Sequence, residues 1–196
     1  KRMSPIDELI FTILTQHTSD LNAEKAFNNL KRHYDNYENI ISADDKKIAK
    51  LIKSGGLSNI KSKRIIGVLS EIQNRVGKLN IDFLKDMSIT KARDWLTSIN
   101  GIGPKTASCV LAFSFGLPVI PVDTHVHRVS KRIGLISNKI SADEAHGILE
   151  NKVKIEDRYK FHVLIIEHGR KVCHSRKPSC VKCSIQNLCE FQRQIN

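Results

Sequence analysis

Four of the five cysteines of this chain lie close together near its end, where their thiolates could bind metal. Cys173, Cys180, Cys183 and Cys189 have the spacing C-x6-C-x2-C-x5-C. Four clustered thiolates are ligands for zinc or for an iron–sulfur cluster. Zinc sites usually have two closely spaced pairs, whereas here only Cys180 and Cys183 form one, so the spacing favours iron and sulfur. Cys109, in the apolar stretch ASCVLAF, is predicted to be a buried structural thiol.

A second motif, SINGIGPKTASCVLAF, joins two predicted helices through a glycine-containing turn. Gly101 and Gly103 permit positive φ and close approach of the backbone, and Pro104 suits the first position of a helix. The N–H groups at the start of that helix can bind a phosphate oxygen. With Ile102 between the glycines, the pattern is a helix–hairpin–helix, which holds a DNA backbone without reading its sequence.

Lys105 directly follows this turn, and its position is compatible with two roles. It can contact a phosphate, or it can act as an amine nucleophile, because the positive end of the helix dipole disfavours the ammonium form. A lysine must be neutral to attack carbon. Asp123 follows in VDTHVHR. Its carboxylate can cap the next helix and, in a cleft facing an amine, can also stabilise a cationic sugar.

The whole chain is basic and has the composition of a globular protein. Its 196 residues include 32 Lys and Arg against 20 Asp and Glu, which makes the net charge +12. A hydrophobic content of 40% with 27% charged residues excludes a disordered chain. No run is long enough to span a membrane and the start, KRMSPIDELI, does not resemble a signal peptide, so we expect an intracellular location. The charge favours a polyanionic partner, first of all nucleic acid.

The elements that must position these residues are helices, because apolar residues recur at helical spacing nearly throughout. Ser4 and Pro5 mark the start of the first helix, Asp20 is the expected cap of the second, and Gly77 should end a later one. No strand alternation is visible. The predicted fold class is therefore all-α. Further helices are expected over residues 90–99, 104–115, 124–134, 141–151 and 157–171.

Three ordered motifs resemble the endonuclease III family of helix–hairpin–helix DNA base-excision glycosylases. They are the stretch from Gly101 to Lys105, Asp123 after a Gly/Pro-rich link, and the four-cysteine end. The resemblance implies a [4Fe–4S] cluster rather than zinc. It also implies a six-helix barrel over residues 1–117, carrying the hairpin at about 95–115, and a second helical domain over 118–196. That domain would hold the cluster loop, 173–189, and the DNA-binding cleft would lie between the two domains.

The family resemblance also implies catalytic roles. Lys105 matches the lysine nucleophile of the bifunctional members, and Asp123 matches their essential aspartate. A damaged pyrimidine would be flipped out of the duplex, displaced by the Lys105 amine at C1′, and the strand cut by β-elimination. The expected activity is that of a DNA glycosylase with abasic-site lyase activity, acting as a monomer on double-stranded DNA. Alternatives are a mismatch uracil or thymine glycosylase and a non-catalytic DNA-binding module.

Further matches to the family indicate which residues contact the lesion. Leu57, in a loop with Asn59 and Lys61, would fill the gap left by the flipped base. Gln16 and His17 occupy the segment in which the family has a glutamine that probes the orphaned base. His17 stands at that glutamine's position, so the opposite-base preference is not fixed by the resemblance.

The positive charge is expected to gather in three places that line the DNA. The first place is the basic loop between Cys173 and Cys180, which contains Arg176 and Lys177. The other two are a group beside Leu57 and a group just beyond Asp123. Their members are Lys61, Lys63, Arg64, Arg128, Lys131 and Arg132.

Overall fold

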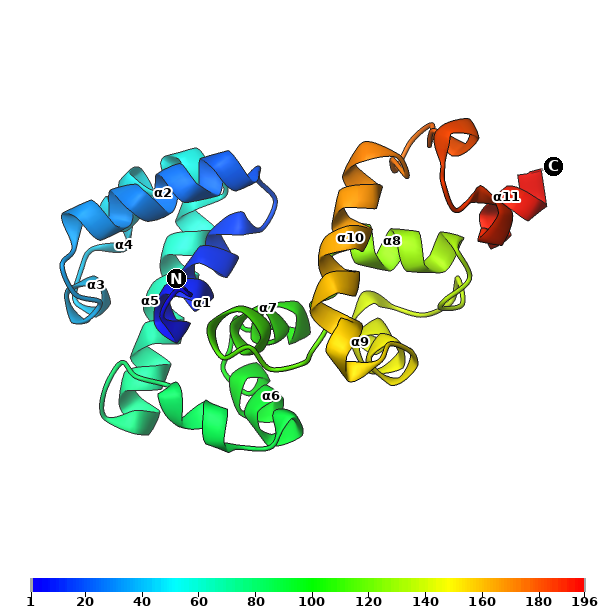
Figure 1. Ribbon diagram of the computed structural model, residues 1–196. Helices are drawn as coiled ribbons and strands as arrows, with labels where there is room; N and C mark the ends of the chain where they lie inside the picture. Colours follow the sequence, from blue (N-terminus) through cyan, green and yellow to red (C-terminus); the bar gives the residue numbers. More distant parts are fainter. Residues whose placement is uncertain (1, 196) are drawn as a thin grey trace. The chain divides into compact units, whose positions relative to one another are not determined.

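The computed structural model describes residues 2–195, which form helices and connecting segments and include no strand (Figure 1). The all-α prediction is thereby confirmed. The chain divides into two compact units, Lys1–Leu117 and Pro118–Asn196. Within the described residues, no helix combines the length and apolar character needed to cross a membrane.

The first unit is built around α1 (Pro5–Thr15), which packs against α2, α5 and α7. Leu9, Ile10, Ile13 and Leu14 form one broad apolar face of α1 and are fully buried, and Glu8 and Thr12 beside this face are buried as well, as expected for a central helix. The remaining helices of the unit are α2 (Asp20–His33), α3 (Glu38–Ile41), α4 (Asp45–Leu51), α5 (Ser58–Val76), α6 (Ile89–Thr97) and α7 (Pro104–Cys109). After α7 the chain continues as a π-helical turn over Val110–Ser114.

The helix ends follow the sequence signals with one correction. Ser4 caps α1 as predicted, since its Oγ accepts a hydrogen bond from Asp7 N at 3.1 Å. Gly77 ends α5 in the left-handed conformation, with φ of 76°. The prediction that Asp20 caps α2 is wrong: Ser19 is the cap, and its Oγ accepts from Asn22 N at 3.3 Å. Asp20 instead occupies the first turn, where a negative charge favours the helix dipole.

The second unit contains α8 (Thr124–Arg132), α9 (Ala142–Lys152), α10 (Arg158–Lys171) and α11 (Glu190–Ile195). Helix α8 packs against both α9 and α10. The core of this unit is apolar and includes Val122, Val126 and Leu149. Helices α8 and α10 approach closely at Gly169, where an added Cβ would lie 2.9 Å from His125 Nδ1. The small residue at this position therefore sets the spacing of the two helices.

Candidate functional site

The turn of the hairpin lies between α6 and α7. Gly101 has φ of 97°, and an added Cβ there would lie 3.0 Å from Arg64 Cγ, so both conformation and space require glycine. Ile102 is buried and its N–H donates to Ile99 O at 3.0 Å. Within residues 2–195, the amides of Gly101 and Gly103 donate no backbone hydrogen bond. The turn thus presents backbone donors to which an anion could bind.

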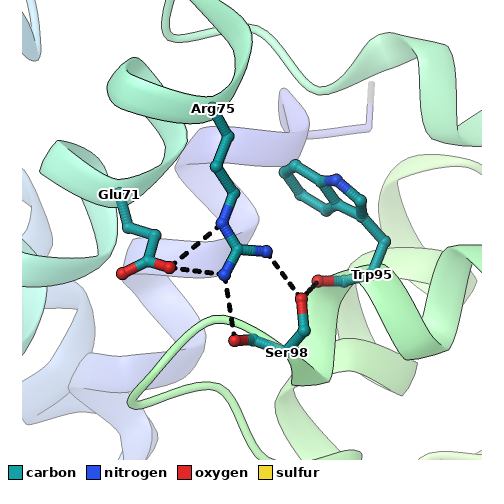
Figure 2. A network of polar contacts seen from close by, with 4 residues as sticks. All are labelled: Glu71, Arg75, Trp95 and Ser98. Carbon is teal, nitrogen blue, oxygen red and sulfur yellow. Dashed lines mark hydrogen bonds and ion pairs between the residues drawn. The ribbon is translucent and has the colours of Figure 1, made fainter.

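A polar network holds the hairpin's first helix against α5 (Figure 2). Arg75 of α5 donates to the Glu71 carboxylate, to Ser98 O at 3.1 Å and to Ser98 Oγ at 2.6 Å. Ser98 Oγ donates in turn to Trp95 O at 2.7 Å, and the Arg75 guanidinium lies 6.0 Å from the centre of the Trp95 ring. The end of α6, just before the glycine turn, is therefore fixed to a long helix of the same unit.

Lys105 lies half-buried in the first turn of α7. Its positive charge lowers the pKa of two groups of the first unit, the Cys109 thiol on α7 and the Glu8 carboxyl on α1, although burial has the larger effect on each. Cys109 is buried as predicted, and burial raises the pKa of its thiol to about 11. Burial also raises the pKa of Glu8. Glu8 is a buried acid that the sequence motifs do not include.

Lys61 is a structural residue rather than a DNA contact. Only 2% of its surface is exposed, and its Nζ donates to Leu14 O at 2.7 Å, Gln16 O at 2.5 Å and Gly55 O at 2.7 Å. An ammonium has three N–H donors, and all three are used inside the fold. The prediction that Lys61 contacts DNA is therefore wrong. Its charge instead joins the end of α1 to the segment that precedes Leu57.

The structure brings the predicted probe and wedge residues together in the first unit. The segment with Gln16 and His17 lies beside the segment with Leu57, because Lys61 binds carbonyls from both sides. Gln16 Oε1 also accepts from Arg64 Nη1 at 2.5 Å. Since the Arg64 side chain packs against the hairpin glycine, it connects the probe segment with the hairpin turn.

Three non-glycine residues have positive φ among the residues described, and all three are predicted DNA contacts. They are His17 with φ of 53°, Leu57 with 46° and Lys177 with 50°. Leu57 is 52% exposed, and His17, Lys177, Asn59 and Arg176 are exposed as well. A left-handed backbone at a leucine is strained, and such strain tends to collect at functional sites. These exposed side chains are free to meet a large ligand.

Asp123 is the cap of α8 in the second unit. Its Oδ1 accepts a hydrogen bond from Val126 N at 2.7 Å, so the capping role predicted for it is confirmed. The side chain is half-buried. Because this bond uses only one carboxylate oxygen, the other can serve a second role. Lys105 belongs to the first unit and Asp123 to the second.

Two arginines of α8 hold the start of the cysteine segment. Arg128 donates to Cys173 O from Nε at 3.2 Å and from Nη2 at 3.0 Å. Arg132 donates to Cys173 Sγ at 3.3 Å, to His174 O at 2.6 Å and to Ser175 O at 3.0 Å. These guanidinium groups are taken up inside the unit, so the expectation that Arg128 and Arg132 line the DNA is wrong. The sequence shows that these two residues are charged, but it does not show that their guanidinium groups bind the cysteine segment.

The cysteine segment supplies four free thiols. Cys189 Sγ lies 3.3 Å from Arg132 O, and Cys183 Sγ lies 3.7 Å from His168 Nε2. Over residues 2–195, no group of three or more His, Cys, Asp or Glu side chains is arranged to hold a metal ion. In number and kind, the four thiols nevertheless match what a [4Fe–4S] cluster requires.

Comparison with known proteins places the chain in a family. Residues 10–154 match the family described as HhH-GPD superfamily base excision DNA repair protein. The chain is 35% identical to the endonuclease III of Sulfolobus acidocaldarius, over 93% of this chain and 80% of that protein. It is 31% identical to a longer Arabidopsis thaliana relative and spans 61% of that protein's length.

A solved structure agrees with this assignment. A trapped endonuclease III–DNA covalent intermediate is similar with a TM-score of 0.84 and 28% identity, covering 100% of this chain and 87% of that one. The chain therefore belongs to the HhH-GPD superfamily of base excision DNA repair proteins.

Proposed function

We propose that this protein is a DNA glycosylase with abasic-site lyase activity and that Lys105 is its nucleophile. The observation that carries the proposal is the placement of Lys105, half-buried in the turn of helix that follows the Gly101–Gly103 hairpin. In the proposed complex, this amine would reach a sugar carbon of the strand that the hairpin amides hold. Membership of a base excision DNA repair family supports the same reaction class.

The proposed reaction needs only groups that the chain provides. A damaged pyrimidine nucleotide is flipped out of the duplex, and the neutral Lys105 amine attacks C1′ as the bond to the base breaks. The resulting Schiff base acidifies the C2′ hydrogen, and β-elimination then cuts the strand on its 3′ side. Asp123 would stabilise the positive charge that develops on the sugar, using the carboxylate oxygen not engaged in capping.

The proposed partner is double-stranded DNA that contains damaged bases or abasic sites, met inside the cell. The amides of Gly101 and Gly103 would donate to a backbone phosphate, and Leu57 would fill the gap left by the flipped base. Gln16, His17 and Asn59 would contact the surrounding nucleotides, as would Arg176 and Lys177 in the other unit. A net charge of +12 supports binding to a polyanion.

We further propose that Cys173, Cys180, Cys183 and Cys189 hold a [4Fe–4S] cluster. When bound, the cluster supplies structural cross-linking of this segment and a centre that can be oxidised. Arg128 and Arg132 hold the backbone around Cys173, and so fix where the first thiolate lies. Cluster ligation requires deprotonated thiols, so acid should release the iron.

Cyanoborohydride trapping on a duplex with one abasic site tests the lyase. The wild-type protein should form a covalent protein–DNA adduct, and a Lys105→Ala variant should form none while still binding the duplex. Lys78→Ala is a matched control, because Lys78 is an exposed lysine of the same unit with no predicted role in DNA binding. Equal trapping by Lys105→Ala would reject the assigned nucleophile, and no trapping by any protein would favour a non-catalytic DNA-binding module.

A second candidate function is a mismatch uracil or thymine glycosylase. The presence of His17 where the family has glutamine favours it, because the exposed imidazole would meet the orphaned base. Duplexes carrying oxidised pyrimidines, G·U or G·T should be compared in single-turnover assays. Faster excision from the mismatches would select this second candidate.

A further inference from the structure

Arg64, half-buried on α5, contacts both the hairpin turn and the segment that contains Gln16 and His17. Its Nη1 donates to Gln16 Oε1 at 2.5 Å. A Cβ added to Gly101 would lie 3.0 Å from Arg64 Cγ and 3.4 Å from Cδ, so the stem of the arginine packs on the turn. One side chain therefore joins two segments of the first unit that are predicted to contact DNA.

Three hydrogen bonds hold Gln16 in place. Its backbone N–H donates to Ile13 O at 3.4 Å, and its backbone oxygen accepts from Lys61 Nζ at 2.5 Å. The third is the bond from Arg64 to the side-chain oxygen. Within residues 2–195, no group accepts a hydrogen bond from Gln16 Nε2. The side-chain nitrogen is thus the polar group of Gln16 that is left for a ligand.

The guanidinium of Arg64 decides which end of the Gln16 amide is left free. A side-chain amide can turn over about its last bond, which exchanges the places of its oxygen and its nitrogen. A guanidinium has only N–H donors and no acceptor, so the oxygen must face Arg64. The free end of Gln16 is consequently an NH2 group, which can donate a hydrogen bond but cannot accept one.

We propose that Arg64 is a positioning residue, which directs Gln16 Nε2 as a hydrogen-bond donor to the orphaned base opposite the flipped nucleotide. The assignment rests on the damaged-DNA binding of the proposed function, in which the segment with Gln16 and His17 meets that base. The recognised group is an acceptor on the Watson–Crick edge, which loses its partner when the opposite nucleotide is flipped out. For an orphaned adenine this acceptor is N1, whereas the N6 amine is a donor.

Binding to duplexes that differ only in the orphaned base tests this polarity. Each duplex carries tetrahydrofuran, an abasic analogue that no lyase can cleave, opposite adenine, purine or 1-deazaadenine. Purine lacks the N6 amine and keeps N1, whereas 1-deazaadenine lacks N1 and keeps the amine. Fluorescence anisotropy measures each Kd. Wild-type protein should bind the adenine and purine duplexes equally, and the 1-deazaadenine duplex about three- to tenfold more weakly, the effect of about one hydrogen bond.

A double-mutant cycle shows whether Arg64 acts through Gln16. Gln16→Met removes the amide at similar side-chain length, so the three Kd values should become equal. Arg64→Met keeps an apolar stem beside Gly101 and frees the amide to turn over. Its oxygen can then accept from N6 while its nitrogen donates to N1, so adenine should bind about threefold or more tightly than purine. The double variant should show no such difference.

Lys63→Met is the control for loss of charge, because Lys63 is an exposed lysine next to Arg64. It removes one positive charge and leaves the bond between Arg64 and Gln16 in place. A phosphate contact does not depend on the base, so this variant should weaken binding to all three duplexes by the same factor. Thermal unfolding of each variant shows that the compared proteins are folded.

The outcomes distinguish this inference from the proposed function. Equal binding of adenine and purine by Arg64→Met would overturn the positioning role, and a preference for N1 that survives Gln16→Met would overturn the donor role. Tetrahydrofuran forms no Schiff base, so failure of cyanoborohydride trapping would reject the lyase and leave these Kd values to decide the present inference. If wild-type protein binds tetrahydrofuran duplexes no more tightly than undamaged DNA, recognition of the orphaned base fails with damaged-DNA binding.

Discussion

At the scale of single residues, the role of a side chain depends more on its surroundings in the fold than on its residue type. Lys61 and Lys105 are both lysines next to a loop, yet Lys61 is buried and fully hydrogen-bonded whereas Lys105 is half-buried in the first turn of α7. A signal for Lys61 was present in the sequence, because it lies four residues before the buried Ile65 and hence on the same face of α5.

Replacing Lys61 should cost stability. Lys61→Met leaves three buried or half-buried carbonyls without their donor, and we expect a loss of about 3 kcal/mol in the free energy of unfolding at neutral pH. Lys63→Met, at an exposed neighbour, should change it by less than about 0.5 kcal/mol. Urea denaturation of both variants measures the difference, and equal stabilities would contradict the role given to Lys61.

The buried position of Lys61 should also make the free energy of unfolding depend on pH. Burial lowers the pKa of Lys61 to about 8, below the value of about 10.4 for an unfolded lysine. Between these values the unfolded chain binds more protons than the folded one, so this group's contribution to stability rises with pH. The stability difference between wild type and Lys61→Met should therefore grow from about pH 8 to about pH 10. A constant difference would show that the ammonium is not destabilised by burial.

Replacing Leu57 should affect DNA repair activity and stability in different ways. Its left-handed backbone, with φ of 46°, is costly for leucine and relaxed for glycine. Leu57→Gly should leave the free energy of unfolding unchanged or raise it by up to about 1 kcal/mol, while slowing excision of a base from intact duplex. Melting curves and single-turnover excision rates provide the check. Full excision activity in Leu57→Gly would contradict the wedge role.

At the scale of elements, helix periodicity and glycine signals predicted most of the fold. The starts of α1 and α7 and the end of α5 lie where Ser4, Pro104 and Gly77 indicate. The short helices α3 and α11 were not predicted, because four or six residues contain too little periodicity to detect. Nor could periodicity predict the π-helical turn after α7, since it depends on packing against α1 and α6.

Two helical glycines should respond to alanine with opposite signs. Gly67 on α5 has open space where a Cβ would lie, so Gly67→Ala should stabilise by about 0.5–1 kcal/mol through helix propensity. Gly169 on α10 would place a Cβ 3.0 Å from His125 Cβ, so Gly169→Ala should destabilise by about 1–3 kcal/mol. Urea denaturation compares the two variants, and stabilisation by Gly169→Ala would show that α8 and α10 are not closely packed.

At the scale of the whole molecule, the sequence predicts the net charge and the family, but it does not predict which individual charged side chains are free to contact DNA. The chain was predicted to be a helical, basic, DNA-directed protein, and its fold class and family are confirmed. The distribution of the positive charge was predicted less well, because Arg128 and Arg132 bind carbonyls and a thiol of their own unit. Linear sequence shows how much charge there is but not which charges already have partners inside the fold.

Because each unit has its own core, loss of the proposed cluster should act on one unit. Iron is removed with acid and a chelator, and hydrogen exchange is measured after return to neutral pH. Amides of α8, α10 and residues 173–189 should exchange faster, while those of α1 and α5 keep their protection. Loss of protection in α1 to the same extent, or purified protein that holds zinc and no iron, would contradict the proposed cluster.

The most direct test of the proposed nucleophile is to locate the covalent bond between protein and DNA. Wild-type protein is trapped on an abasic duplex with cyanoborohydride, digested with protease and nuclease, and analysed by tandem mass spectrometry. We predict one modified residue, Lys105, carrying the reduced sugar remnant on Nζ. A remnant on any other lysine or on the N-terminal amine, with Lys105 unmodified, would contradict the assignment.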